Sequence, residues 1–380
     1  MKKLILDTHC EIYDLLKPWA DGLFWNLEEH ISSGNLVSDA VYVIGREQIK
    51  KYSTIVRQLV NENTIKVIFS NPAEGSDTLR MHCKVYGIEN LVLQKKILLI
   101  GGGEMGSEYA YLMYDSFLSK ILDYDENISA QTRTDEIFSN ILKPYKFFFL
   151  NGRIRPHRKF LLEKFNKSGL LDKCIWSCLD SNGSNNRNIR LLDDNKNLMS
   201  NPSKIQYLAK KYEHPRYQSR TEISTTDGFV KYDLFNNEWG EVYIEPQGYI
   251  DSFFSLVTET VFEYPYSFRT EKIWKPVAVG HPWVAVANQG FYRDIRNLGF
   301  QTFGHLIDES FDLIENNQDR IERIAELVED LCQQDLATFL KECYNVCKYN
   351  QQHLAEMRIK VRQEFPDRFF KFLKQYNFDE

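Results

Sequence analysis

The sequence predicts an α/β protein with two Rossmann-like halves in tandem and a helical C-terminal segment. As far as Ala287, short apolar runs alternate with amphipathic stretches, which is the pattern of strands joined by helices. The 380 residues are 43% hydrophobic and 14% aromatic, enough to bury a large core in two domains or one large one. From Glu309 onward the sequence becomes charged with helical spacing. We therefore expect parallel sheets with crossover helices, followed by C-terminal helices.

Each half contains a series of candidate strands. In the first half, turn-forming or polar residues and then an amphipathic stretch follow each apolar run, at Lys3–Leu6, Ala40–Ile44, Ile65–Phe69 and Lys96–Ile100. The second half has its own series at Lys146–Leu150, Cys174–Cys178, Phe253–Thr258 and Trp283–Ala287. These two series predict two parallel sheets.

The domain boundaries follow from composition. Residues 123–135 are polar and mixed, and the boundary is expected near Lys143 and Pro144, which gives domains 1–143 and 144–312. A stretch rich in Asn, Ser and Asp, from Asp180 to Asn201, reads as an exposed loop. Segment 313–380 is expected to be helical and to pack across both halves, with helix-spaced apolar residues at Ile321, Ile324, Leu327 and Leu331 and further ones from Phe339 to Phe372.

Charge and cysteine content narrow the class of protein. The formal net charge of -6 provides no global basic field, so nucleic acid would require a local basic patch. Seven scattered cysteines favour reduced thiols. The N-terminal residues reach Asp7 and His9 before a signal-peptide core develops, and no stretch approaches the roughly 20 apolar residues of a membrane span. A cytoplasmic location is expected.

A glycine-rich loop offers a dinucleotide-binding interpretation. Residues Gly101–Gly106 satisfy the Gly-x-Gly-x-x-Gly fingerprint after an apolar run, and a helix is expected from Ser107 to Leu122. The acidic partner should end a second strand about 20 residues later, whereas Asp123 and Asp125 lie at the end of the expected helix. The loop is therefore interpreted as an NAD site, as a glycine turn at the mouth of a sheet, or as a loop that contacts donor phosphate or acceptor.

A second motif has the chemistry of a nucleotide-sugar donor site. Glu259 ends a strand, Thr270 is placed to cap a helix that opens with Glu271 and Lys272, and Gly280 precedes an apolar strand. A departing diphosphate develops negative charge, which a cation and helix-start amides stabilise. Lys272 is the candidate cation, and Glu271 and Glu259 are candidate acceptors for sugar or base hydroxyls. The alternative is a capped surface helix with solvated charges.

This segment resembles the donor-binding region of the α-1,3-fucosyltransferase family, and it is similar to glycosyltransferases proposed for bacteriophages and marine microbes. The likeness covers about 30 residues. It implies two Rossmann-like domains that face each other across a cleft, the GT-B arrangement, and an inverting, metal-independent transfer without a cofactor. Phe268 replaces the family's tyrosine, and loop 261–266 carries an extra Glu263, so the donor is left as UDP- or GDP-linked.

A cluster of cations follows the strand 146–150. Open α/β sheets bind ligands at the carboxyl ends of their strands, where Asn151, Arg153, Arg155 and Arg158 would meet a diphosphate. The fucosyltransferase family has an asparagine at this strand end and an arginine at the start of the next helix, which Arg158 matches. The alternative is a basic, solvated turn.

A carboxylate of the first half is expected to act as general base on the acceptor hydroxyl. Glu74, in the stretch Ser70–Gly75 after a strand, resembles the position of the family's base, although it could equally cap the next helix. Glu104 in the glycine loop is the second candidate, followed by Asp7 and His9. The motif Asp123-Tyr124-Asp125 resembles a metal-binding Asp-x-Asp but reads as a solvated helix end.

The sequence therefore favours a glycosyltransferase that moves a sugar from a nucleoside-diphosphate sugar to an acceptor hydroxyl. Glycan, lipid and modified DNA all stay open as the acceptor. A narrower version acts on hydroxymethylated bases of phage DNA, for which Arg153, Arg155 and Arg158 would supply phosphate contacts. The alternatives from other classes are an NAD(P)-dependent oxidoreductase that uses the glycine loop and a non-catalytic carbohydrate- or nucleotide-binding module.

Overall fold

The computed structural model describes residues 2–123, 125–151, 155–180, 188–189, 191–192, 198–199, 223–226, 229–232, 244 and 246–379. The chain forms two compact units. The first comprises Met1–Ser119, Tyr264–Arg269 and Glu356–Glu380, and the second comprises Lys120–Glu263 and Thr270–Ala355. Each unit contains its own sheet with parallel strands, so the α/β class is confirmed. The expected boundary near Lys143 lies inside the second unit, and segment 313–380 is divided between the units after Ala355.

The first unit has a six-stranded parallel sheet in the order β2-β1-β3-β4-β5-β6. Its strands are β1 (Leu4–Asp7), β2 (Gly22–Phe24), β3 (Val41–Gly45), β4 (Lys66–Asn71), β5 (Ile97–Gly101) and β6 (Tyr111–Met113). Its helices are α1 (Tyr13–Leu16), η1 (Lys17–Trp19), α2 (Leu27–Ser32), α3 (Arg46–Asn61), α4 (Ser76–Val85), α5 (Glu89–Leu93) and α6 (Ser116–Lys120), which ends one residue beyond the unit. Four of the six strands match the apolar runs in the sequence.

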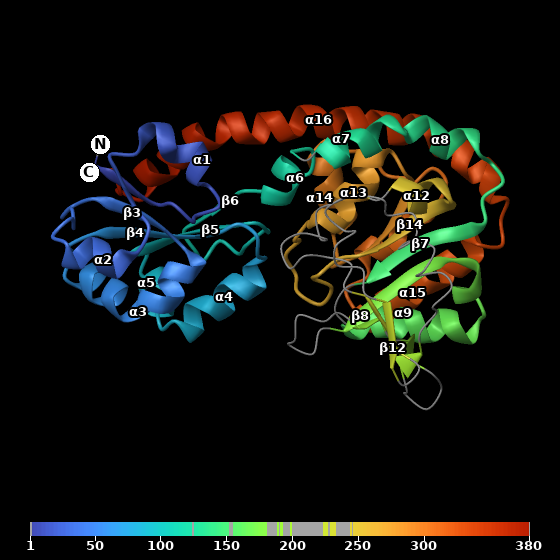
Figure 1. Cartoon of the computed structure of the whole chain (residues 1–380), viewed down its shortest axis with the longest axis horizontal. Helices are drawn as coiled ribbons and strands as arrows, with labels where there is room; N and C mark the ends of the chain where they lie inside the picture. Colours follow the sequence, from blue (N-terminus) through green and yellow to red (C-terminus); the bar gives the residue numbers. More distant parts are fainter. Residues whose placement is uncertain are drawn as a thin grey trace. The chain divides into compact units, whose positions relative to one another are not determined.

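Alternate residues of each strand enter two separate cores. Tyr42 and Phe69 pack on one face, in the core that also holds side chains of α3, α4 and α5. Val43 and Ile68 face the other way, into the core that also holds Leu16 of α1 and aromatic residues near the end of the chain. Figure 1 shows α3, α4 and α5 on one face of the sheet and α1 on the other. Burial on both faces explains why these strands read as continuous apolar runs.

The expected helix from Ser107 to Leu122 is wrong. The chain instead runs through a turn into β6 and then the short α6. Ala110 and Leu112 are buried in the same core as β5, and Leu99 and Gly101 pair with Tyr111 and Met113. Pairing with the sheet therefore overrides the helical pattern, because the edge of β5 offers main-chain partners that the local sequence does not reveal.

The second unit's larger sheet, within the described residues, has the order β12-β13-β9-β8-β7-β14-β15, with β8, β7, β14 and β15 parallel. The strands of this unit are β7 (Tyr145–Asn151), β8 (Ile175–Asp180), β9 (Asn188–Ile189), β10 (Leu191–Leu192), β11 (Leu198–Met199), β12 (Ile223–Thr226), β13 (Phe229–Tyr232), β14 (Ser252–Thr258) and β15 (Trp283–Val286). All four expected strands are present. Most of stretch 180–201, expected as an exposed loop, lies outside the described residues.

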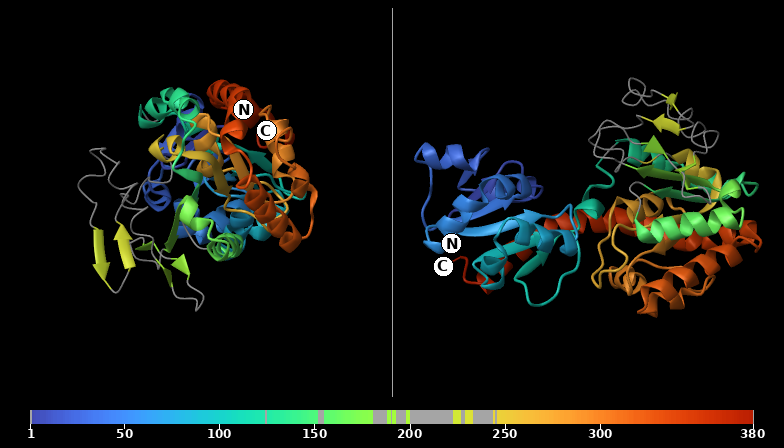
Figure 2. Two further views of the ribbon diagram at one scale, coloured as in Figure 1. Left: turned by 90° about the vertical axis from the view of Figure 1, so that its right-hand side faces the viewer. Right: turned by 90° about the horizontal axis from the view of Figure 1, so that it is seen from below.

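Helices cover both faces of the parallel part of this sheet. The helices among the described residues of this unit are α7 (Asp125–Thr132), α8 (Thr134–Ser139), α9 (Pro156–Lys167), η2 (Leu171–Lys173), α12 (Pro246–Ile250), α13 (Glu271–Val279), α14 (Phe291–Asn297), η3 (Glu309–Leu313), α15 (Asn317–Leu331) and the part of α16 (Leu336–Gln375) that ends at Ala355. Phe165 of α9 packs against Phe147 and Phe149 of β7, whereas Phe148 contacts Tyr249 of α12 on the other face. Helices α9 and α15 lie side by side (Figure 2).

The C-terminal helices are confirmed. The four helix-spaced residues of α15, Ile321 among them, are all buried. In α16, Gln351 donates to the carbonyl of Ala278 within the second unit, whereas Arg368 donates to the carbonyl of Met113 within the first. Phe365 and Phe369 enter a core of the first unit. Each unit is therefore completed by a different part of α16.

Candidate functional site

The second unit has a topological switch point between β7 and β14. From β7 the chain crosses through α9 to β8 on one side, whereas β14 lies on the other side and leads through α13 to β15. Ligands of open α/β sheets bind at such a point, beyond the carboxyl ends of the strands. Asn151 and Thr258 occupy the two strand ends, and the hydroxyl of Thr258 donates to Oδ1 of Asn151 over 2.6 Å. The predicted residues Asn151 and Glu259 are therefore brought to neighbouring strand ends.

Glu259 ties the end of β14 to the start of α13. Its side chain is fully buried, and it accepts hydrogen bonds from the backbone N–H of Thr270 at 3.1 Å and from the Thr270 hydroxyl at 2.7 Å. Burial raises the pKa of this carboxyl above its ordinary value, while Lys272 and the Thr270 hydroxyl act against that rise. Because both carboxylate oxygens serve the protein's own backbone and hydroxyl groups, Glu259 positions the helix start.

The start of α13 agrees with the local prediction. Thr270 is the N-cap, and its hydroxyl accepts from the backbone N–H of Lys272. The helix ends at Gly280, whose φ of 71° is in the left-handed region that favours glycine, and the chain then enters the buried β15. Thr-Glu-Lys thus opens a capped helix of nine residues whose first turn lies at the switch point.

Lys272 and Glu271 form a charged pair in this first turn. The ammonium Nζ lies 2.5 Å from Oε1 of Glu271 and 3.1 Å from the Thr270 hydroxyl. Glu271 is buried, whereas about a quarter of the Lys272 side chain is exposed. Burial by itself would raise the pKa of Glu271, but the charges of Lys272 and Lys275 lower it below the ordinary value. The first turn therefore holds an ionised carboxylate and a cation that reaches solvent.

Arg158, which was expected to meet a diphosphate, is buried against backbone carbonyls. Its guanidinium is buried and donates to the backbone carbonyls of Thr258 at 2.9 Å and Glu259 at 3.3 Å. The neighbouring His157 bonds the Glu259 carbonyl through Nε2 at 3.1 Å, and burial lowers its pKa to about 3. Both side chains hold the end of β14 in place. Arg155 is the N-cap residue of α9 and is partly exposed, and Arg153 lies outside the described residues.

The glycine-rich loop of the first unit is explained by close packing. A Cβ on Gly102 would lie 2.1 Å from the carbonyl oxygen of Pro72, and one on Gly103 would lie 2.9 Å from the Ser267 carbonyl oxygen. The backbone N–H of Glu104 donates to that same Ser267 oxygen over 2.8 Å. Since the chain continues from this loop into β6 and no helix begins directly after it, the loop lacks the helix N-terminus on which a dinucleotide pyrophosphate would rest.

Glu104, the second candidate base, pairs with Arg269. Its Oε1 lies 3.5 Å from Nη2 of Arg269, and Nε of the same buried guanidinium donates to Asp115 over 3.1 Å. The Glu104 side chain is nearly half exposed. Glu104 thus belongs to a three-residue ion cluster in the first unit.

Glu74, the first candidate base, lines a pocket in the first unit. The pocket measures about 180 Å³ and lies where β1, β3 and β4 end, with Asp7, His9 and Asn71 in its wall. Oε1 of Glu74 lies 3.7 Å from Nη1 of Arg46. The order β2-β1-β3 makes this position the switch point of the first sheet. The structure therefore brings Glu74, Asp7 and His9 together and leaves Glu104 out of that pocket's lining.

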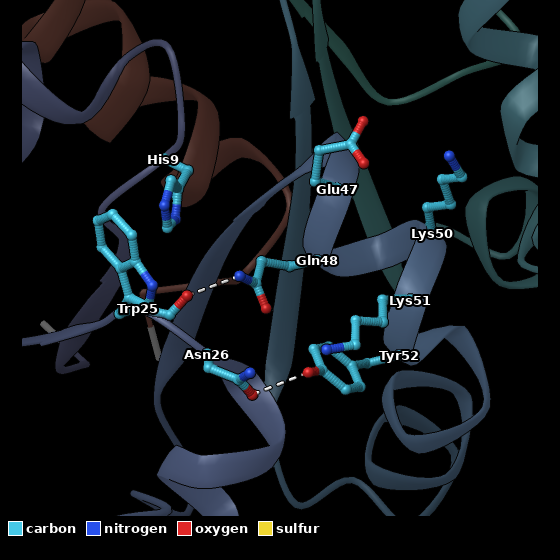
Figure 3. A pocket seen from close by; sticks show the side chains of 8 residues that line it. All are labelled: His9, Trp25, Asn26, Glu47, Gln48, Lys50, Lys51 and Tyr52. Atoms are coloured by element: carbon cyan, nitrogen blue, oxygen red, sulfur yellow. Dashed lines mark hydrogen bonds between the residues drawn. The ribbon is translucent and has the colours of Figure 1, made fainter.

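A second pocket of about 440 Å³ shares His9 and Glu47 with the first. Figure 3 shows His9 beside Trp25 on one side and side chains of α3, including Lys51 and Tyr52, on the other. Gln48 donates to the Trp25 carbonyl over 2.7 Å. None of the sequence motifs includes Trp25 or Tyr52 of this pocket. The sequence does place Trp25 directly before Asn26, the N-cap of α2. A tryptophan at a helix start need not be buried in the core, so this position was a signal for an exposed aromatic side chain.

Comparisons of the chain with protein-family models, with curated proteins and with solved structures find no match. Among the described residues, no helix is both long and apolar enough to traverse a bilayer.

Proposed function

We propose that this protein is a glycosyltransferase that moves a sugar from a nucleoside-diphosphate sugar to an acceptor hydroxyl. The observation that carries the proposal is the position of Lys272 in the first turn of a capped helix at the β7/β14 switch point. A departing diphosphate develops negative charge, which a cation at the start of a helix would stabilise. The resemblance of the same segment to the α-1,3-fucosyltransferase family supports the proposal independently of charge.

The placement of Lys272 is unusual for a purely structural lysine. A helix N-terminus carries partial positive charge, so a cation in the first turn is disfavoured unless an anion lies close by. Glu271 supplies one such anion at 2.5 Å, and its own carboxylate is buried. Lys272 is partly exposed, so a diphosphate would meet both its ammonium and the amides of the first turn.

The surrounding groups would keep this cation in place. Glu259 holds Thr270, Thr270 caps α13, and Arg158 and His157 hold the carbonyls at the end of β14. Because these contacts fix the groups around Lys272, the protein would reorganise little when the diphosphate departs. We propose that the transfer inverts the anomeric centre and proceeds without a metal ion, with Lys272 and helix amides as the positive charge at the leaving group.

A panel of nucleotides would test the donor site. Thermal unfolding of the wild type is measured with GDP, UDP, ADP, CMP, their sugar conjugates and NADH. A ligand at 100 times its dissociation constant stabilises the fold by about 2.7 kcal/mol, which is a readily measured shift. We expect one nucleoside diphosphate to stabilise the wild type selectively, and Lys272→Ala to lose most of that stabilisation.

Lys341→Ala is the matched control, because Lys341 is an exposed lysine of α16 in the same unit. It should respond to the nucleotide like the wild type. Stabilisation by NADH alone, unchanged in Lys272→Ala, would contradict the donor site and favour the oxidoreductase. Release of free nucleoside diphosphate upon addition of acceptor then tests for transfer itself.

A further inference from the structure

The paired pockets of the first unit have the features of a carbohydrate-binding site. Trp25 is 69% exposed, which leaves a large aromatic surface in water beside a cavity. A pyranose ring presents an apolar face of C–H groups to a flat aromatic ring, whose face carries partial negative charge, and its hydroxyls bond polar groups around the edge. Asn26, Gln48 and Tyr52 supply such polar groups in the same pocket (Figure 3).

The charge of the pockets favours a neutral ligand over an anionic one. Their linings contain the carboxylates of Asp7, Glu11, Glu47 and Glu74 and the cations of Arg46, Lys50 and Lys51. Four carboxylates against three cations provide no net attraction for a phosphate group. A polyhydroxyl ligand, in contrast, can donate to the carboxylates and accept from the cations at the same time.

His9 lies where the two pockets meet and is paired with a buried carboxylate. Its Nδ1 is 3.4 Å from Oδ1 of Asp7, and its ring centre is 3.6 Å from that of Trp25. Asp7 is held in turn, since its Oδ2 accepts from the backbone N–H of Gly45 over 2.9 Å. With Nδ1 facing Asp7, Nε2 is left to accept a hydrogen bond from a ligand. The His9 side chain is 40% exposed, so a ligand can reach it.

We propose that these pockets bind a carbohydrate whose ring stacks on Trp25 and whose hydroxyls bond the polar groups around it, with Nε2 of His9, positioned by Asp7, as one acceptor. The inference goes beyond the proposed transfer and does not depend on it, because it needs only residues of the first unit.

Binding is tested without any donor. Protein labelled with 5-fluorotryptophan is titrated with methyl β-D-galactoside, lactose and chitobiose, and with sorbitol as an open-chain polyol that lacks a ring face. Trp25→Phe and Trp19→Phe assign two resonances of the exposed tryptophans. We expect at least one cyclic sugar, and not sorbitol, to shift the Trp25 resonance while the Trp19 resonance stays unchanged. A Trp25 resonance that no cyclic sugar shifts would overturn the carbohydrate site.

The lining residues are tested by calorimetric titration with the glycoside that shifts Trp25. Trp25→Ala should raise the Kd of that glycoside about tenfold, and His9→Ala should raise it about threefold. His305→Ala, at an exposed histidine of the second unit, should bind like the wild type. A Kd that stays unchanged in His9→Ala would remove His9 from the site.

The outcomes separate this inference from the proposed function. If the wild type binds glycosides at Trp25 but neither binds nor consumes a nucleotide sugar, the transferase is contradicted and the carbohydrate site stands. If a nucleoside diphosphate stabilises the wild type but no cyclic sugar shifts the Trp25 resonance, the carbohydrate site is overturned and the donor site stands.

Discussion

The hydroxyl of Thr270 donates a 2.7 Å hydrogen bond to the buried carboxylate of Glu259, and it also accepts from the backbone N–H of Lys272. One hydroxyl thus links the end of β14 to the first turn of α13. The position of Lys272 depends on this link, because the cation is carried two residues beyond the cap. The end of β14 and the start of α13 are therefore fixed relative to each other.

Thr270→Val tests this link. The variant keeps the shape of the side chain but removes the cap and one partner of a buried carboxylate. We expect the free energy of unfolding to fall by about 1–3 kcal/mol, since caps and buried acceptors each contribute on this scale. Urea denaturation followed by circular dichroism measures the change. Thr270→Ser retains the hydroxyl and should lose far less, and equal losses in both variants would show that packing of the methyl group contributes as much as the hydroxyl.

Arg158 should matter more for stability than for donor affinity. Its guanidinium satisfies two backbone carbonyls at the end of β14, so Arg158→Met leaves these buried acceptors without that donor. We expect a loss of about 2–4 kcal/mol in the free energy of unfolding, measured by urea titration. A variant that unfolds like the wild type but no longer binds the nucleotide would instead make Arg158 a direct donor contact, as the family resemblance implies.

Gly102→Ala should destabilise the first unit. The new Cβ would lie 2.1 Å from the Pro72 carbonyl oxygen, which belongs to the backbone and cannot move aside cheaply. We expect a loss of about 1–3 kcal/mol, the usual range for overpacking, with nucleotide affinity of the second unit unchanged. Ser107→Ala, at an exposed position of the same loop, serves as the control in the same thermal unfolding measurement. Loss of NADH binding as the main effect would revive the dinucleotide interpretation.

Two buried histidines should make the fold sensitive to acid. Burial lowers the pKa of His157 and of His281 to about 3, and His281 bonds the Ser252 carbonyl and the Ser255 hydroxyl. Between about pH 6.5 and 3 the unfolded chain binds protons that the two histidines of the folded protein do not bind. The free energy of unfolding therefore falls as the pH falls. Each histidine contributes at most about 1.4 kcal/mol per pH unit.

The measurement is the free energy of unfolding in urea between pH 7 and pH 5. His281→Gln, which cannot take up a proton, should show a shallower dependence than the wild type, whereas His305→Gln at an exposed position should match it. An identical slope in His281→Gln and the wild type would mean that other groups control the acid sensitivity.

Sequence patterns predicted the features that depend on residues close together in the chain, such as strands and a helix cap. The strands β3, β4, β5 and β14 are apolar runs because both faces of each sheet are covered, so their positions could be predicted without knowledge of their neighbours. The start of α13 was equally accessible, since capping by Thr270 acts on a backbone group two residues away. The α/β class and the place of Lys272 at a helix start could therefore be predicted without the structure.

Other features depend on contacts between residues far apart in the chain. The sequence predicts Arg158 as a phosphate ligand, but it does not reveal that the guanidinium donates to carbonyls 100 and 101 positions away. The glycine loop resembles a dinucleotide fingerprint until Ser267 approaches its backbone. His9 and Trp25 form a pocket with α3 only after β1, β2 and β3 pair. These contacts could not be predicted from the sequence, because the energy of a buried charge or of a close backbone approach depends on which distant group lies against it.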